Sequence, residues 1–332
     1  MVGRSNCTCD RRNVIVLAME LRVLTEPQQG ATFDQQLAVA RLAEECGFTG
    51  FFRTDHLQRE GDADGMPGPT DAWITLAGLA RETSRIRLGT LMTCSTFRNP
   101  GHLAIMVAQV DEMSGGRVEL GLGAGSFAGE HHALGIPFPP AKERFARLEE
   151  QLALITGLWT ASPGHPYSFQ GQYHAVRDYP ALVRPRQSPH PPLVLGGPGL
   201  KRTPALAAKF ADEYNADGVS PAECAAAYDR IGAACEKIGR DPAEMTFSAV
   251  VTICCGSDPA EIALRTNTIA VKGGSDFTGH AANGATGTPA QVAERLRAFE
   301  EAGASRIYLQ LFDLTDLDHL RLVAEEVLPQ LS

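Results

Sequence analysis

The chain alternates short apolar segments with longer amphipathic ones, and this alternation restricts the possible folds more than any other feature of the sequence. We expect eight strands, each short, apolar and rich in branched or aromatic residues, at about residues 14–24, 50–54, 86–93, 118–121, 193–196, 213–216, 245–253 and 306–310. Helical periodicity is found at residues 33–46, 70–83, 102–113, 145–159, 202–210, 221–238, 259–271, 289–302 and 316–331. Eight strands that alternate with helices predict an α/β fold of the TIM (β/α)8 barrel type rather than a doubly wound sheet.

The length of the chain agrees with one barrel. This fold typically takes about 250 residues, and the chain has 332. Met19 precedes what reads as a complete first strand and loop, whereas the leader that contains Cys7 and Cys9 is polar and rich in arginine. We therefore expect an N-terminal extension at residues 1–18, Met19 as the start of the native chain, and a single barrel domain at residues 19–332.

Residues 161–192 and 272–287 are two long segments rich in Gly, Pro and polar residues. Loops of this length inside a compact fold are usually functional. In a barrel, the long loops that follow strands lie on the catalytic face and shape its pocket. We therefore expect long insertions in the βα loops, with both segments over a substrate pocket.

The composition excludes several classes of protein. The formal net charge of −9 argues against a broad nucleic-acid surface, and no segment approaches the roughly 20 apolar residues that span a bilayer. The eight cysteines show neither a disulfide framework nor paired metal-ligand spacing. With no secretory signal in the sequence, we expect a cytoplasmic protein without a metal site.

Unusual residues gather where the predicted strands end. The second strand ends in Asp55 and His56, and the fourth runs into the glycine-rich stretch 121–126. The carboxyl ends of barrel strands form the catalytic face, so these residues are expected to meet there. A histidine can exchange protons near neutral pH, and an adjacent carboxylate can hold its tautomer. Taken alone, such a pair is more often structural.

A second group of candidates follows the fifth strand, where glycines join a strand end to a helix start. Their free amides and two neighbouring bases could hold a phosphate; these residues are Gly196, Gly197, Gly199, Lys201 and Arg202. The alternative is a tight turn with solvated bases. Asn215 is expected at the pocket end of the next strand.

Taken together, the motifs resemble the bacterial-luciferase-like superfamily, and within it most closely the branch that uses the deazaflavin coenzyme F420. The matching motifs run in order from Met19 to Leu331 and fall at residues 55–57, 88–90, 96–100, 114–117, 120–125 and 195–197. The resemblance implies a luciferase-like barrel and a flavin-type cofactor, either F420 or, alternatively, flavin mononucleotide (FMN).

The resemblance also implies roles for the early strand ends. Asp55 and His56 would lie over the face of the deazaflavin ring, where His56 would transfer a proton or polarise the ring. Leu91 and Met92 would form a bulge with a cis non-prolyl peptide that backs the ring. Cys94 would contact the ring edge.

The glycine-rich stretch departs from the family pattern at one position. Gly123 and Gly125 would let the chain pass close to the cofactor. Several F420-dependent relatives carry an acid at the next position, but this chain has Ser126. The same loop offers three substitutes for the missing acid: Glu130, His131 and His132.

Three functions are consistent with these residues. The first is hydride transfer between C5 of F420 and a small organic substrate. The second is a two-component monooxygenase that uses reduced FMN and oxygen, and the third is a barrel that only binds a ligand. Relatives pair through early barrel helices, and the predicted helix at residues 102–113 carries apolar residues around much of its surface, so we expect a homodimer.

Overall fold

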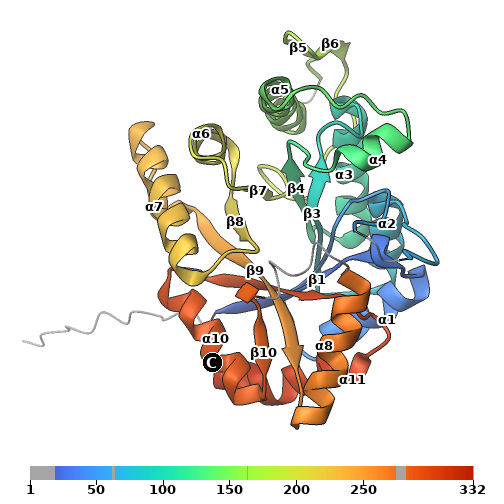
Figure 1. The fold of residues 1–332 in the computed structure, drawn as a ribbon. Coiled ribbons are helices and arrows are strands. Elements are labelled where there is room, and N and C mark those ends of the chain that lie inside the picture. The colour runs from blue at the N-terminus through green and yellow to red at the C-terminus, as the bar shows by residue number, and fades with distance from the viewer. Residues whose placement is uncertain (1–18, 62–63, 163, 274–281, 332) are drawn as a thin grey trace, which may run out of the picture.

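Eight parallel strands close into a barrel surrounded by helices (Figure 1). The computed structural model describes residues 19–61, 64–162, 164–273 and 282–331. Each barrel strand pairs with the next, and β8–β9 and β11–β1 pairings complete the cylinder. The strands are β1 (Glu20–Thr25), β2 (Gly50–Arg53), β3 (Arg87–Cys94), β4 (Val118–Gly123), β7 (Leu193–Gly196), β8 (Glu213–Asp217), β9 (Thr246–Cys255) and β11 (Arg306–Leu311). The predicted (β/α)8 barrel is confirmed, while the proposed extension at residues 1–18 lies outside the described residues.

The helices fall where the apolar periodicity predicts them. They are α1 (Phe33–Glu45), α2 (Ala72–Glu82), α3 (Pro100–Ser114), α5 (Ala141–Thr160), α6 (Arg202–Phe210), α7 (Pro221–Lys237), α8 (Pro259–Gly273), α10 (Pro289–Glu301) and α11 (Leu317–Leu322). The closing segment continues from α11 through a π-helical turn, Val323–Val327, and a 3-10 turn, Leu328–Gln330. Among the described residues, no helix combines the length and the apolar character that a membrane crossing requires.

Local capping explains where several helices begin. The side chain of Asp71 accepts hydrogen bonds from the amides of Trp73 and Ile74, both at 2.9 Å, and so starts α2. Apolar faces then hold the helices on the barrel, as Trp73, Leu76 and Leu79 of α2 are almost fully buried. A separate cluster fills the barrel interior and consists of Leu24, Phe52, Leu91, Val194, Val250 and Tyr308.

Four short elements escaped the sequence pattern: α4 (Ala128–Ala133), the antiparallel strands β5 (Tyr167–Gln170) and β6 (Ala175–Tyr179), and β10 (Ala285–Gly287). The β5–β6 hairpin belongs to the long segment 161–192 and lies beyond α5, at the top of the view in Figure 1. Near the end of this segment, the Gln187 side chain donates to the carbonyl oxygen of Val118 at the start of β4 (2.6 Å).

The prediction that residues 161–192 cover the pocket is therefore wrong. This segment follows a helix and leads to the amino end of a strand, whereas pocket-forming loops follow strands. The long βα loops of this chain are residues 54–71 and 124–140, and the second contains α4. Residues 274–281 of the segment 272–287 lie outside the described residues, and Gly273 lines the main cavity.

Candidate active site

A cavity of about 800 Å³ opens at the carboxyl ends of the barrel strands, and residues from all eight strands or their following loops line it. It brings together most of the residues that the sequence singles out: Asp55, His56, Leu91, Met92, Cys94, Gly123, Gly125, Ser126, Glu130, Gly196, Gly197, Gly199 and Asn215. His131, Lys201 and Arg202 are not among its lining residues.

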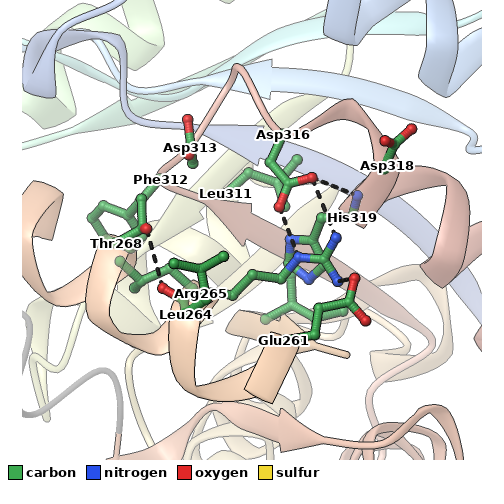
Figure 2. A pocket seen from close by; sticks show the side chains of 12 residues that line it. Glu261, Leu264, Arg265, Thr268, Leu311, Phe312, Asp313, Asp316, Asp318 and His319 are labelled. Atoms are coloured by element: carbon green, nitrogen blue, oxygen red, sulfur yellow. Dashed lines mark hydrogen bonds and ion pairs between the residues drawn. The ribbon is translucent and has the colours of Figure 1, made fainter. Parts of the chain in front are cut away.

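A smaller cavity of about 420 Å³ lies between α8 and the loop after β11 (Figure 2). Its central cation, Arg265, pairs with Asp316 and Glu261, each at 2.7 Å. Nε2 of His319 accepts the backbone amide of Cys255 at 2.9 Å. The polar groups of this cavity thus pair with one another, so the larger cavity is the candidate site.

One wall of the large cavity is a bulge in β3. The Leu91–Met92 peptide is cis, as the resemblance predicts, and the pairing of β3 with β4 shifts between Thr90 and Thr93. A Cβ atom at Gly123 would lie 2.7 Å from the sulfur of Met92. The glycine leaves space for this side chain, so that the bulge packs closely against β4.

The glycines at and after the end of β4 also leave space for neighbouring side chains. Gly125 has φ +83°, and a Cβ atom there would lie 2.3 Å from Sγ of Cys94. Gly123 and Gly125 make room for the side chains of Met92 and Cys94. Both glycines also line the cavity, and the prediction that they let the chain pass close to the cofactor stays a prediction.

His56 is held by carboxylates. Its Nδ1 lies 3.1 Å from Oε1 of Glu130, and its Nε2 lies 3.7 Å from Oε1 of Glu60. Because a carboxylate can only accept, the ring N–H donates to Glu130. The other oxygen of Glu130 accepts the backbone amide of Leu57 at 2.8 Å, which fixes α4 against the loop after β2.

The charge state of His56 follows from this environment. Burial alone would lower the pKa of the imidazole, but the hydrogen bond to Glu130 and the negative charges of Glu60 and Glu130 outweigh it. The pKa of His56 rises to about 9. The ring is therefore protonated at neutral pH while 23% of its side chain remains exposed.

Asp55 does not hold the ring of His56, contrary to prediction. Its carboxylate is buried, accepts from Oγ1 of Thr93 at 2.8 Å and pairs with Arg98. Arg98 also pairs with Asp71 at 2.6 Å and so ties this network to the cap of α2. Asp55 and His56 are consecutive but bind different partners. Glu130, rather than Asp55, orients the imidazole ring of His56.

His131 and His132 are poor substitutes for the missing acid. His131 is fully buried, and its Nδ1 donates to the carbonyl oxygen of Phe127 at 2.7 Å. Its ring packs between Phe97 and Phe138, with centroids at 4.9 and 4.4 Å. His132 is exposed and does not line the cavity. Of the three predicted substitutes, only Glu130 lines the cavity and contacts His56.

The predicted phosphate cradle is only partly assembled. Gly196, Gly197 and Gly199 line the cavity, whereas Lys201 and Arg202 are exposed. The guanidinium of Arg202 instead donates to the carbonyl oxygen of Lys142 at 2.8 Å and lies over the ring of Phe145. The structure therefore does not bring these two bases to the cavity.

Buried hydroxyl and amide groups take the place of these bases. Oγ1 of Thr203 and Oδ1 of Asn215 are buried without a hydrogen-bond partner among the described residues, and both side chains line the cavity. The other end of the Asn215 amide donates to Ser248 at 2.8 Å. Buried polar groups are normally paired, so these two atoms are available to a ligand that enters the cavity.

Sequence reasoning missed Glu26, Gln29, Gln310 and Arg230, all of which line the cavity. Glu26 directly follows β1, so the strand-end rule that selects Asp55 could have found it. Gln310 lies within β11, and no sequence pattern distinguishes it from the other residues of that strand. Arg230 lies within α7, where an arginine reads as part of a solvated helix face.

The chain matches the family model described as luciferase-like monooxygenase over residues 14–306. It therefore belongs to this family, and the resemblance read from the motifs is confirmed. Among solved structures, an F420-dependent secondary alcohol dehydrogenase in complex with an F420-acetone adduct has a TM-score of 0.82 at 19% identity, over 95% of this chain and 99% of that chain. This likeness confirms the fold.

Two similar curated proteins are named as F420-dependent dehydrogenases. F420-dependent glucose-6-phosphate dehydrogenase from Microbacterium testaceum (strain StLB037) is 38% identical over 174 residues, which are 52% of this chain and 49% of that protein. F420-dependent hydroxymycolic acid dehydrogenase from Mycobacterium tuberculosis (strain ATCC 25618 / H37Rv) is 32% identical over 230 residues, which are 68% of this chain and 61% of that protein. The chain spans about half the length of the first curated relatives it matches.

Proposed function

We propose that this protein is an F420-dependent oxidoreductase that transfers a hydride between the deazaflavin and a small organic substrate. The proposal rests on one observation above all: His56, held by a hydrogen bond to Glu130, faces a large cavity at the carboxyl ends of the strands. The names of the two dehydrogenase relatives support F420 as the cofactor.

The residues present fit such a cofactor. Leu91 and Met92 form an apolar wall for a flat ring. The turn after β7 offers backbone amides, and Thr203 adds a buried hydroxyl without a partner in the described chain, so both suit a phosphate group. Arg230 supplies a cation to the cavity lining. When bound, deazaflavin would supply hydride chemistry at a carbon atom.

His56 would handle the proton that accompanies the hydride. A carbonyl substrate that receives a hydride at carbon also needs a proton at oxygen, and Nε2 of the protonated imidazole can provide it. Glu130 would act as a positioning residue that holds the ring and keeps its pKa high. With His56 protonated at neutral pH, this arrangement favours substrate reduction. Alcohol oxidation would require the neutral imidazole at higher pH.

A fluorescence titration tests the cofactor assignment. Purified protein should quench F420 fluorescence in a saturable manner and respond weakly to FMN. Tight FMN binding with oxygen consumption, and no response to F420, would instead identify a two-component monooxygenase. F420 binding without turnover of any alcohol or carbonyl compound would leave a ligand-binding barrel.

We also propose a homodimer, for which α3 offers only part of the predicted surface. Leu103 and Val107 are buried in the core of the subunit, whereas Ile105 and Met106 remain partly exposed. Sedimentation at micromolar concentration should show a dimer, and a monomer under those conditions would contradict the proposal.

A further inference from the structure

The end of the cavity below the loops after β1 and β11 is built around a buried carboxylate. Glu26 is 7% exposed and lines the cavity. Its Oε2 accepts from Nε2 of Gln28 and its Oε1 accepts from Nε2 of Gln310, each at 2.7 Å. These amides fix the carboxylate without neutralising its charge.

The amides themselves are held in place by hydroxyl groups. Oε1 of Gln28 accepts from Thr54 at 2.7 Å, and Oε1 of Gln310 accepts from Thr252 at 2.6 Å. Because each amide oxygen is occupied, each amide must present its N–H groups to Glu26. The position of Glu26 is therefore set by four side chains from separate parts of the barrel.

A neighbouring side chain offers a second acceptor. Gln29 is 7% exposed, its Nε2 donates to the carbonyl oxygen of Glu60 at 3.3 Å, and its Oε1 has no partner among the described residues. Gln29 and Glu60 both line the cavity. The polar groups that Glu26, Gln29 and Glu60 present here accept hydrogen bonds, so a ligand must supply the donors.

The charges of the residues that line the cavity also disfavour an anionic ligand at this end. Arg230 is the only Lys or Arg among the described lining residues, and it lies on α7, beyond the strands that hold the proposed cofactor cradle. The residues left undescribed between 61 and 64 and between 273 and 282 contain neither Lys nor Arg in the sequence. A phosphate group at the acceptor-lined end would meet Glu26 and Glu60 with no Lys or Arg to offset them, and the imidazolium of His56 already pairs with Glu60 and Glu130.

The barrel order assigns this end to the substrate. Neighbours β1 and β11 lie across the barrel from β4 and β7. Gly123 of β4 packs against the β3 bulge, and the proposed phosphate cradle follows β7. A cofactor on the β4–β7 side would leave the β1–β11 side open, with His56 of the loop after β2 between them. This assignment rests on the proposed function.

We propose that Glu26 and Gln29 select substrates that donate hydrogen bonds, and that the substrate is an uncharged or cationic alcohol or carbonyl compound rather than a phosphate ester. Hydroxyl groups donate hydrogen bonds through O–H and ammonium groups through N–H, so both can bind these acceptors. The protein would thus differ in substrate class from its relative named for glucose 6-phosphate.

A fragment screen tests this inference without the cofactor. Saturation-transfer NMR on the full chain would use a library balanced among neutral hydroxyl compounds, amines and phosphate or carboxylate compounds. Some fragments should give a saturation-transfer signal at least tenfold weaker with Glu26→Gln than with the parent protein. These fragments should be hydroxyl compounds or amines, and the signal should fall most for the amines. Gln29→Leu should weaken the same fragments, whereas Glu45→Gln, the same change on the exposed surface, should leave them unchanged.

The outcomes separate this inference from the proposed function. An anionic majority among the Glu26-sensitive fragments, or no fragment that responds to Glu26→Gln, overturns the inference. A second arm compares glucose, glucosamine and glucose 6-phosphate with the F420-loaded protein. A tenfold preference for glucose 6-phosphate over glucose also overturns the inference and leaves the proposed function intact. Failure to bind F420 while the fragment pattern holds rejects only the proposed function.

Discussion

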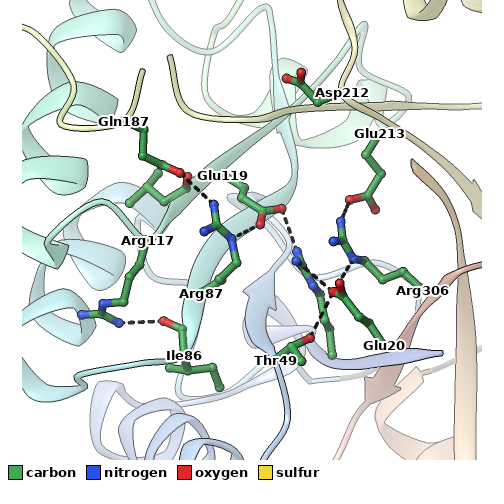
Figure 3. Close-up of polar contacts among 12 residues, drawn as sticks. Glu20, Thr49, Ile86, Arg87, Arg117, Glu119, Gln187, Asp212, Glu213 and Arg306 are labelled. Carbon is green, nitrogen blue, oxygen red and sulfur yellow. Dashed lines mark hydrogen bonds and ion pairs between the residues drawn. The ribbon is translucent and has the colours of Figure 1, made fainter. Parts of the chain in front are cut away.

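The two ends of the barrel use charge in opposite ways. At the amino end, ionised side chains pair with one another and close the barrel (Figure 3). At the carboxyl end, charged and polar side chains surround a cavity, and several of their atoms lack partners in the described chain. The comparison separates groups that hold the fold together from groups that are available to a ligand.

The amino-end network centres on two buried arginine–glutamate pairs. Arg22 lies 2.7 Å from Glu119, which also pairs with Arg87. Arg306 pairs with Glu213 and, at 2.9 Å, with the more exposed Glu20. Among the buried side-chain atoms of these residues, only Nε of Arg22 lacks a partner in the described chain.

The electrostatics of this end follow from the pairing. Burial would raise the pKa of Glu119, but the charges of Arg22 and Arg87 outweigh burial and hold the pKa well below its usual range. The guanidinium of Arg22 also lies 5.2 Å from the ring centroid of Phe52. At the other end, by contrast, a carboxylate raises the pKa of a histidine that stays partly exposed.

The largest expected effect is on stability and comes from the amino end. Glu119→Gln should lower the free energy of unfolding by about 3 kcal/mol, because it leaves a buried guanidinium without its countercharge. Urea unfolding measures the change. Glu20→Gln, at a side chain that is 42% exposed, should cost at most about 1 kcal/mol. Equal losses in the two variants would contradict the idea that burial determines how much each ion pair contributes to the free energy of unfolding.

The next effect is on turnover and comes from the carboxyl end. His56→Ala should retain its fold and at least part of its cofactor affinity while losing about 100-fold or more in turnover, the usual scale for a lost general acid or base. Steady-state kinetics at saturating F420 provide the measurement, with His102→Ala on the exposed face of α3 as the control. Turnover within a few-fold of the parent would reduce His56 to a packing residue.

The third prediction concerns the pKa of His56. Its folded value, about 9, lies above the ordinary 6.5, so the imidazolium contributes stability that is fully present below about pH 6.5 and is lost as the pH rises through about 9. Glu130→Gln removes the hydrogen-bonded charge and should lower this pKa by at least about one unit, equivalent to about 1.4 kcal/mol. NMR titration of the imidazole measures the shift directly.

Activity should follow the same titration. The alkaline limb of the pH profile for substrate reduction should move to lower pH in Glu130→Gln, while the rate near pH 6 changes little. A uniform loss of rate with an unchanged His56 pKa would mean that Glu130 only stabilises α4.

The barrel itself was predictable because its evidence is repetitive. Each strand is a short apolar run and each helix repeats its apolar face, so tertiary packing and local pattern agree. Boundaries shifted by a few residues at most, with two exceptions. The first strand was predicted from residue 14, whereas β1 begins at Glu20 and residues 14–18 lie outside the described part of the chain. In the closing segment, the predicted helix breaks into shorter turns after Leu322. The β5–β6 hairpin was missed because its strands are short and alternate weakly between partly buried and exposed residues.

The candidate site was predictable as a list of residues but not as a set of contacts. Position at a strand end indicates that Asp55 and His56 lie near the cavity, but it does not specify their partners. His56 pairs with a glutamate 74 positions away that lies on a six-residue helix. A pairing of that kind depends on how a loop folds back, and no local spacing encodes it.

The start of α6 gives the smallest predicted effect and the finest distinction between adjacent residues. Successive helical residues point about 100° apart, so Thr203 lines the cavity while Arg202 turns toward α5. Thr203→Val should weaken F420 binding by about 1 kcal/mol, the usual contribution of one hydrogen bond, without lowering the melting temperature. Isothermal titration at low salt should show a smaller loss for the double variant Lys201→Ala, Arg202→Ala. A larger, salt-sensitive loss in the double variant would mean that these bases turn inward to hold the anionic cofactor, which would restore the cradle as the sequence predicts it.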